Sequence, residues 1–153
     1  MSQINQNRIV AKFGGTSLAD YDAMVRSAQI IIDNPNIRLV VVSASAGVTN
    51  HLVTLTSQSM TANEVEALLA QIADVQTQIL DAFSAPESVR KRIEIMLYEL
   101  AQLAFHPDLL TSPSIQDEVL SYGERLSSTL FAQVLNHLAK GNVAHWFDCR
   151  RVV

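Results

Sequence analysis

The first fifty residues switch between a strand pattern and a helix pattern. Residues 9–13 and 38–43 are short, β-branched, nearly unbroken apolar runs, which are typical of parallel strands covered on both faces. Between them, residues 20–32 place apolar side chains at helical spacing, with Asp20 suited to cap the helix and residues 34–36 suited to end it. A strand, a glycine turn, a helix and a second strand predict an α/β fold with a parallel sheet.

The rest of the chain has mainly helical periodicity. Thr61 and Asn63 are alternative N-caps for the first long helix, and Pro86 suits the start of the second. The predicted helices cover residues 68–83, 86–104 and 116–138.

The C-terminal region carries a helix stop and a further apolar run. Lys140 followed by Gly141 predicts the end of the last helix, and residues 143–147 predict another strand. Residues 148–153 then end on apolar side chains, with no turn and no polar tail. This ending is typical of a chain that is cut in mid-fold.

Composition narrows the class of protein. Hydrophobic residues make up 48% and charged residues 17% of the 153 residues, which is a globular balance. A net charge of −4 disfavours nucleic acids and anionic membranes as partners. The polar start is unlike a signal peptide, and no apolar run approaches the ~18 residues of a membrane span. Cys149 is the single cysteine, so it cannot form an internal disulfide, and it is expected to be a buried apolar residue. From the lack of a disulfide, a signal peptide and a membrane span, we expect a soluble, cytoplasmic protein.

The first candidate site is the Gly14-Gly15 turn after the first strand. Ligands of open α/β sheets bind outside the carboxyl ends of the strands, and glycines there let backbone N–H groups approach phosphate. Lys12 lies close enough to bring an ammonium group to the same place. The pattern differs from a Walker A loop and from a dinucleotide fingerprint. From these residues alone, a plain tight turn beside a strand lysine is the simpler interpretation.

The second candidate is the small-residue loop of residues 43–50. Ser43, Ser45 and Thr49 carry hydroxyl groups that could donate hydrogen bonds to a small anionic ligand. Thr49 or Asn50 is equally suited to cap the helix that follows.

The third candidate is Gly123-Glu124 in the last helix. Gly123 falls within the apolar arc, where a glycine costs up to about 1 kcal/mol relative to alanine and suggests close approach by another group. Glu124 lies at the margin of this face, suited either to receive an amino group or to be solvated, and Arg125 is expected to point to solvent.

Other reactive side chains have simpler interpretations. The four histidines lack ligand spacing, so the sequence predicts no metal site. Residues 90–92 form a basic cluster that suits a solvated helix face, and Trp146 suits the core.

Together, three segments resemble the aspartate kinases of the amino acid kinase superfamily: residues 12–17, residues 42–50, and Gly123-Glu124 followed by Ser127. Residues 19–28 are most similar to the monofunctional lysine-sensitive type. The resemblance implies a three-layer αβα sandwich, incomplete in this chain. It also implies ATP-dependent phosphorylation of L-aspartate to 4-phospho-L-aspartate, the first step toward lysine, threonine and methionine.

The resemblance also implies roles for particular residues. Lys12 would be the catalytic residue that stabilises the transferring phosphoryl group, with Gly14 and Gly15 donating backbone N–H groups to the phosphates of ATP bound with Mg²⁺. Ser43, Thr49 and Glu124 would hold the aspartate, and Glu124 would face its α-ammonium group. The attacking carboxylate is already ionised at neutral pH, so no general base is needed.

Members of this family continue well beyond 153 residues, with a nucleotide-binding half and lysine-binding ACT domains. The resemblance therefore implies that residues 1–153 are the N-terminal part of the amino acid kinase catalytic domain. We expect the chain to bind aspartate, to be inactive alone, and to correspond to part of an enzyme that is a homo-oligomer in its full-length form. Two alternatives stay open. One is an amino acid kinase with another acceptor, such as glutamate or acetylglutamate. The other is a non-catalytic module that binds a metabolite or pairs with a full-length subunit.

Overall fold

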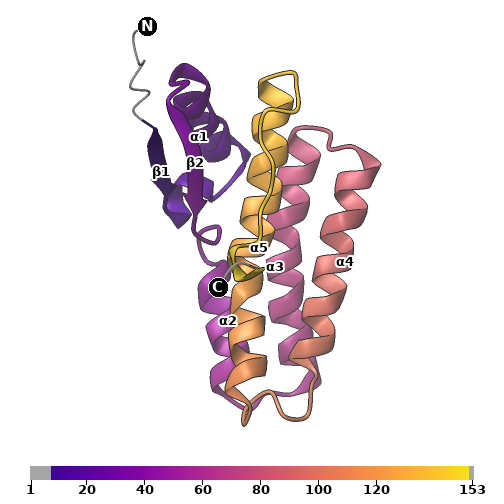
Figure 1. Ribbon diagram of the computed structural model, residues 1–153. Helices are drawn as coiled ribbons and strands as arrows, with labels where there is room; N and C mark the ends of the chain where they lie inside the picture. The colour runs from indigo at the N-terminus through magenta and orange to yellow at the C-terminus, as the bar shows by residue number, and fades with distance from the viewer. Residues whose placement is uncertain (1–7, 152–153) are drawn as a thin grey trace, which may run out of the picture.

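A computed structural model describes residues 8–151. The chain folds into strands β1 (Ile9–Phe13) and β2 (Ile37–Val42), helices α1 (Tyr21–Asp33), α2 (Val48–Ser57), α3 (Ala62–Ala82), α4 (Glu87–Ala104) and α5 (Pro113–Leu138), and the short 3₁₀ helices η1 (Gly15–Leu18) and η2 (Cys149–Arg151). The long helices α3, α4 and α5 stand side by side, and the strands with α1 flank α5 at one end (Figure 1). The predicted α/β class with a parallel sheet is confirmed.

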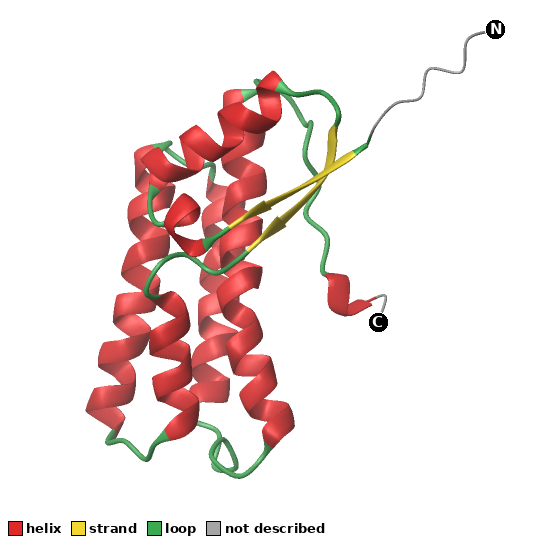
Figure 2. Cartoon of the chain, turned by 90° about the vertical axis from the view of Figure 1, so that its left-hand side faces the viewer, coloured by secondary structure: helices red, strands yellow, loops and turns green. Residues whose placement is uncertain are grey.

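The two strands form a parallel sheet in which Phe13 lies beside Val42. Phe13 faces the helices, and its ring packs against that of Phe131 on α5 with 5.8 Å between centroids. Side chains of the opposite face are open, with Val10 61% and Leu39 57% exposed. The expectation that both faces are covered is therefore wrong for the described residues, because the helices lie on one side of the two strands, as Figure 2 shows, with α5 in contact with β2.

Helix starts follow local capping chemistry. The carboxylate of Asp20 accepts a hydrogen bond from the backbone N–H of Ala23 at 2.8 Å, as predicted for α1. Thr61, one of the two expected candidates, caps α3 through a capping box with Glu64. Hydrogen bonds from the backbone and side chain of Thr61 lower the pKa of Glu64 below its ordinary value.

Two helix ends differ from the sequence prediction. Helix α2 begins at Val48, with Gly47 before it in a left-handed conformation (φ 85°), so neither Thr49 nor Asn50 is its N-cap. A glycine adopts that conformation without steric cost. After α5, Lys140 rather than Gly141 has positive φ (52°).

Residues 143–147 do not form the predicted strand. The side chain of Asn136 on α5 accepts hydrogen bonds from the N–H groups of Val143 and Ala144 at 2.9 and 2.8 Å, in place of a strand partner. The segment then runs back along α5 (Figure 1), and the indole N–H of Trp146 donates to the hydroxyl of Ser128 at 2.8 Å. Cys149, expected to be buried, is exposed.

The core lies among the helices and includes residues from each of them. The largest fully buried apolar side chains come from η1 and α1 to α5: Leu18, Met24, Leu52, Leu55, Ile72, Ile79, Ile93, Leu100, Leu126 and Leu130. Arg90, expected on a solvated face, instead closes the α3–α4 turn through Asp81 (2.7 Å) and the carbonyl groups of Leu80 and Ala85. Within residues 8–151, no helix is both long and apolar enough to cross a membrane.

Candidate functional site

The loops that follow β1 and β2 are joined by backbone hydrogen bonds. The N–H of Ser43 donates to the carbonyl of Phe13 at 3.0 Å, and the N–H of Ala46 donates to the carbonyl of Gly15 at 3.2 Å. The two strands are parallel, so both loops leave the same edge of the sheet. The first and second candidate segments therefore form one surface.

Helix α5 brings the third segment against the same loop. A Cβ atom on Gly123 would lie 2.8 Å from the Cβ of Ala44 and 3.2 Å from a methyl carbon of Leu52. On the other side, a Cβ on Gly15 would lie 2.9 Å from the carbonyl oxygen of Ala44. The loop thus passes between two glycines, and the expectation that another group approaches Gly123 closely is confirmed.

Ser127, one turn beyond Gly123, ties α5 to the loop. Its hydroxyl donates to the carbonyl oxygen of Ser43 at 2.8 Å and is enclosed within the protein. Sequence reasoning placed Ser127 in the third motif but found no role for it. Its spacing of one turn from a packed-face glycine was the available signal.

Lys12 lies on the open face of the sheet, because β1 alternates and its neighbour Phe13 faces the helices. Its ammonium nitrogen is 3.9 Å from the position that a Cβ on Gly14 would occupy. The cation therefore stands at the glycine turn and is exposed to solvent. The sequence analysis expected the ammonium group of Lys12 to reach this turn, because Lys12 lies near the end of the strand.

The predicted substrate-side residues surround this unit. Ser43 is half-buried at the end of β2, Thr49 is exposed in the first turn of α2, and Glu124 is exposed next to Gly123. Ser45 differs from the expectation, because it is only 2% exposed and its hydroxyl is enclosed. Ser45 therefore presents no donor to a ligand in this conformation.

Arg125 does not point to solvent as expected. Its guanidinium lies over the ring of Tyr122 at 4.0 Å from the centroid, and its side chain is 17% exposed. The hydroxyl of Tyr122 donates to the carboxylate of Glu99 on α4 at 3.1 Å. Burial is the main reason that the pKa of Tyr122 is raised. Helical periodicity could not reveal this packing, because the partner Glu99 lies on another helix.

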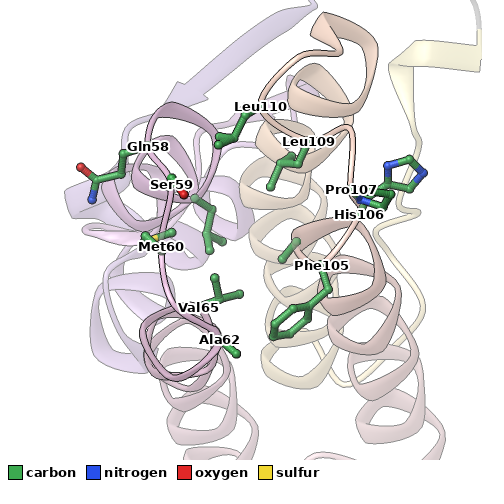
Figure 3. A pocket seen from close by; sticks show the side chains of 12 residues that line it. Gln58, Ser59, Met60, Ala62, Val65, Phe105, His106, Pro107, Leu109 and Leu110 are labelled. Atoms are coloured by element: carbon green, nitrogen blue, oxygen red, sulfur yellow. The ribbon is translucent and has the colours of Figure 1, made fainter.

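A hollow of about 250 Å³ lies between the α2–α3 and α4–α5 connections (Figure 3). Its lining is mostly apolar and contains none of the predicted site residues: Leu55, Gln58, Ser59, Met60, Ala62, Val65, Ala104, Phe105, His106, Pro107, Leu109 and Leu110. Among the described residues there is no cluster of His, Cys, Asp and Glu that could hold a metal ion.

The site combines a parallel strand pair, a glycine turn with a lysine, and a helical Gly-Glu pair that packs on one loop. This combination agrees with the class of protein that the family comparison identifies. Residues 7–151 match the profile of the Amino acid kinase family, and the chain belongs to that family. Within the family it is aspartokinase-like: it is 44% identical over 145 residues to "Lysine-sensitive aspartokinase 3" of Escherichia coli (strain K12). That match covers 95% of this chain and 32% of the relative.

Other similar proteins are also aspartokinases by name. A protein of Haemophilus influenzae (strain ATCC 51907 / DSM 11121 / KW20 / Rd) named "Putative inactive aspartokinase 3" is 58% identical over 60 residues, which are 39% of this chain and 49% of that protein. The crystal structure of E. coli aspartokinase III in complex with aspartate and ADP superimposes with a TM-score of 0.87 at 43% identity. It covers 95% of this chain, which in turn spans 32% of that chain. The predicted amino acid kinase fold is thus confirmed as a partial domain.

Proposed function

We propose that this chain forms the aspartate side of an aspartate kinase site, which phosphorylates the side-chain carboxylate of L-aspartate. The observation that carries the proposal is the loop at Ala44 held between Gly15 and Gly123. This packing places the glycine turn, the hydroxyl loop and the Gly-Glu pair at one edge of the sheet. The similarity to a structure that contains aspartate and ADP supports the choice of substrate.

On the amino-acid side, the exposed carboxylate of Glu124 accepts hydrogen bonds from the α-ammonium group of aspartate. Ser43 and Thr49 donate hydroxyl hydrogen bonds to its carboxylate oxygens. All three residues belong to elements locked together at Ala44, so the substrate is oriented by a rigid unit.

On the phosphoryl side, Lys12 and the backbone N–H groups of Gly14 and Gly15 neutralise the charge that develops during transfer. The ammonium of Lys12 already lies beside Gly14, so these groups are together where they would contact the phosphates of a nucleoside triphosphate. ATP with Mg²⁺ supplies the phosphoryl group when bound. The aspartate carboxylate is ionised at neutral pH and needs no proton removed before attack.

We assign the adenine and ribose contacts to sequence outside this chain, because the chain aligns with only 32% of its E. coli relative. The 153 residues alone are then expected to bind aspartate without catalysing transfer. A non-catalytic role in binding a metabolite or pairing with a full-length, oligomeric subunit is the second candidate. It is favoured by the similarity to the H. influenzae protein whose name describes it as inactive.

Isothermal titration calorimetry with the 153-residue chain tests the acceptor. We expect L-aspartate to bind at least about tenfold more tightly than L-glutamate or N-acetyl-L-glutamate. The variant Glu124→Gln should weaken aspartate binding about tenfold, because the charged partner of the ammonium is lost. Glu94→Gln, a matched change at an exposed glutamate of α4, should leave the affinity unchanged. Equal affinity for glutamate would contradict the acceptor, and no binding of any amino acid would favour a subunit-pairing module.

An assay of ADP release with ATP, Mg²⁺ and L-aspartate tests the second half of the proposal. We expect no release above background from this chain alone. Sustained aspartate-dependent release by the purified 153 residues would show that the nucleotide-side contacts are already present.

A further inference from the structure

We propose that a second hollow, between α4, α5 and the segment after α5, binds an organic anion with an apolar body. Its volume is about 460 Å³. Three cationic side chains line it, Lys91, Arg92 and Arg125, against the single carboxylate of Glu99. The chain as a whole has a net charge of −4, so this basic lining is a local exception to the overall charge.

Two carboxylates of the protein, those of Glu99 and Asp148, lie near the guanidinium of Arg125, and no hydrogen bond joins it to either among the described residues. The nearest carboxylate oxygen, on Glu99, is 3.9 Å from Nη2 of Arg125, which is too long for a hydrogen bond. Nε and Nη1 of Arg125 are enclosed and find no hydrogen-bond acceptor among the described residues. A guanidinium in this state is costly, and an anion in the hollow would lower that cost.

The remaining walls suit an apolar or aromatic group. Ile95 and Met96 of α4 line the hollow, and Trp146 lines it from the C-terminal segment. The indole of Trp146 is held by its hydrogen bond to Ser128, and the guanidinium of Arg92 lies 4.6 Å from its ring centroid. A fixed indole beside cations matches a ligand that carries both a ring or aliphatic body and a negative group.

The lining residues are separate from the proposed aspartate site, so the two proposals can fail independently. The kind of ligand that fits these lining residues is a carboxylate or phosphate joined to an apolar body. A volume of about 460 Å³ lies within the size range of small-molecule sites.

Trp146 is the only tryptophan of the chain, so its fluorescence reports directly on this hollow. The 153-residue chain would be titrated with phenyl phosphate, phenylacetate, inorganic phosphate and benzyl alcohol. We expect saturable changes in emission with the aromatic anions, and binding at least about tenfold weaker for inorganic phosphate and benzyl alcohol. The relative midpoints for phenyl phosphate and phenylacetate distinguish a phosphate from a carboxylate ligand.

Variants test the cations. Lys91→Gln and Arg92→Gln, both at exposed positions, should each raise the midpoint for the aromatic anions about three- to tenfold. Arg26→Gln, at an exposed arginine of α1, is the matched control and should not shift it. Midpoints rather than amplitudes are compared, because Arg92 contacts the reporting indole.

The proposal is overturned if neither aromatic anion gives a saturable change up to roughly 10 mM. It is also overturned if benzyl alcohol binds as tightly as the anions, or if both lysine and arginine variants bind like the control. Each of these results would show that the cations do not recognise a ligand.

Discussion

Gly123 of α5 lies so close to Ala44 that a Cβ atom on the glycine would stand 2.8 Å from the Cβ of that alanine. Real Cβ atoms do not approach each other this closely without displacement of one element. The contact joins the Gly-Glu pair to the loop after β2, so the stability of the fold and the geometry of the proposed site depend on the same two residues.

Gly123→Ala should therefore destabilise the chain, although alanine favours a helix by up to about 1 kcal/mol over glycine. Overlap with Ala44 and Leu52 should outweigh that gain and leave a net loss of about 1–3 kcal/mol in the free energy of unfolding, measured by urea denaturation. Gly141→Ala is the control, since the nearest atoms to its Cβ would be 3.9 Å away. A Gly123→Ala chain as stable as the parent would contradict the close contact.

Ser127→Ala should remove the hydrogen bond to the carbonyl of Ser43 and leave that acceptor partly buried without its partner. We expect a loss of about 1–2 kcal/mol in the free energy of unfolding and weaker aspartate binding in calorimetry. Ser114→Ala, at an exposed serine in the first turn of the same helix, should change neither quantity measurably. Equal results for the two variants would show that the hydrogen bond between α5 and the loop contributes neither to stability nor to aspartate binding.

Thr61→Ala should cost about 1 kcal/mol of stability at neutral pH, because it removes the N-cap of α3. Asn63→Ala, the alternative cap candidate, should cost much less. The pKa of Glu64 is lowered in the fold, so its contribution is present above its ordinary pKa and is lost as pH falls below about 4. Urea denaturation at neutral and acid pH should therefore show a smaller difference between wild type and Thr61→Ala in acid. A constant difference would argue against the capping box.

Leu39→Glu should reduce self-association. Leu39 is 57% exposed on the open face of the sheet, where it and Val10 present apolar surface. Within residues 8–151, the outer edges of β1 and β2 have no partner strand. Sedimentation velocity should show the wild-type chain associating with rising concentration and the variant remaining closer to monomer. Ile30→Glu changes an equally exposed residue on α1 (56%) and serves as the control. Equal suppression by both variants would point to net charge rather than to the sheet face.

Local chemistry explains which elements could be predicted. Asp20 caps α1 and Thr61 caps α3 through atoms within three residues, so the signal is contained in the sequence. The sequence analysis did not predict that Gly15 meets the loop after β2, although the predicted parallel pairing places both loops at a common edge of the sheet. The roles of Lys12, Gly14, Gly15, Ser43, Thr49 and Glu124 remain predictions that the binding experiments test.

Tertiary contacts explain the failures. Residues 143–147 have strand composition, but strand formation needs a neighbour, and here Asn136 satisfies the first two N–H groups. Arg125 occupies an outward position by helical periodicity, yet its guanidinium lies over the ring of Tyr122 one turn earlier on α5 and 3.9 Å from the carboxylate of Glu99 on α4. The contact with Glu99 is not visible from spacing along the chain, because the two residues lie on different helices.

The sequence by itself determined the parallel strand pair, the helices and the residue types of the proposed site, because caps, periodicity and glycine turns act over a few residues. Only the tertiary structure decided that Ala44 separates Gly15 from Gly123, and that Ser127 bonds to Ser43 across 84 positions of sequence. Contacts of this kind depend on how whole elements pack, since the atoms involved meet only after the helices have docked on the sheet.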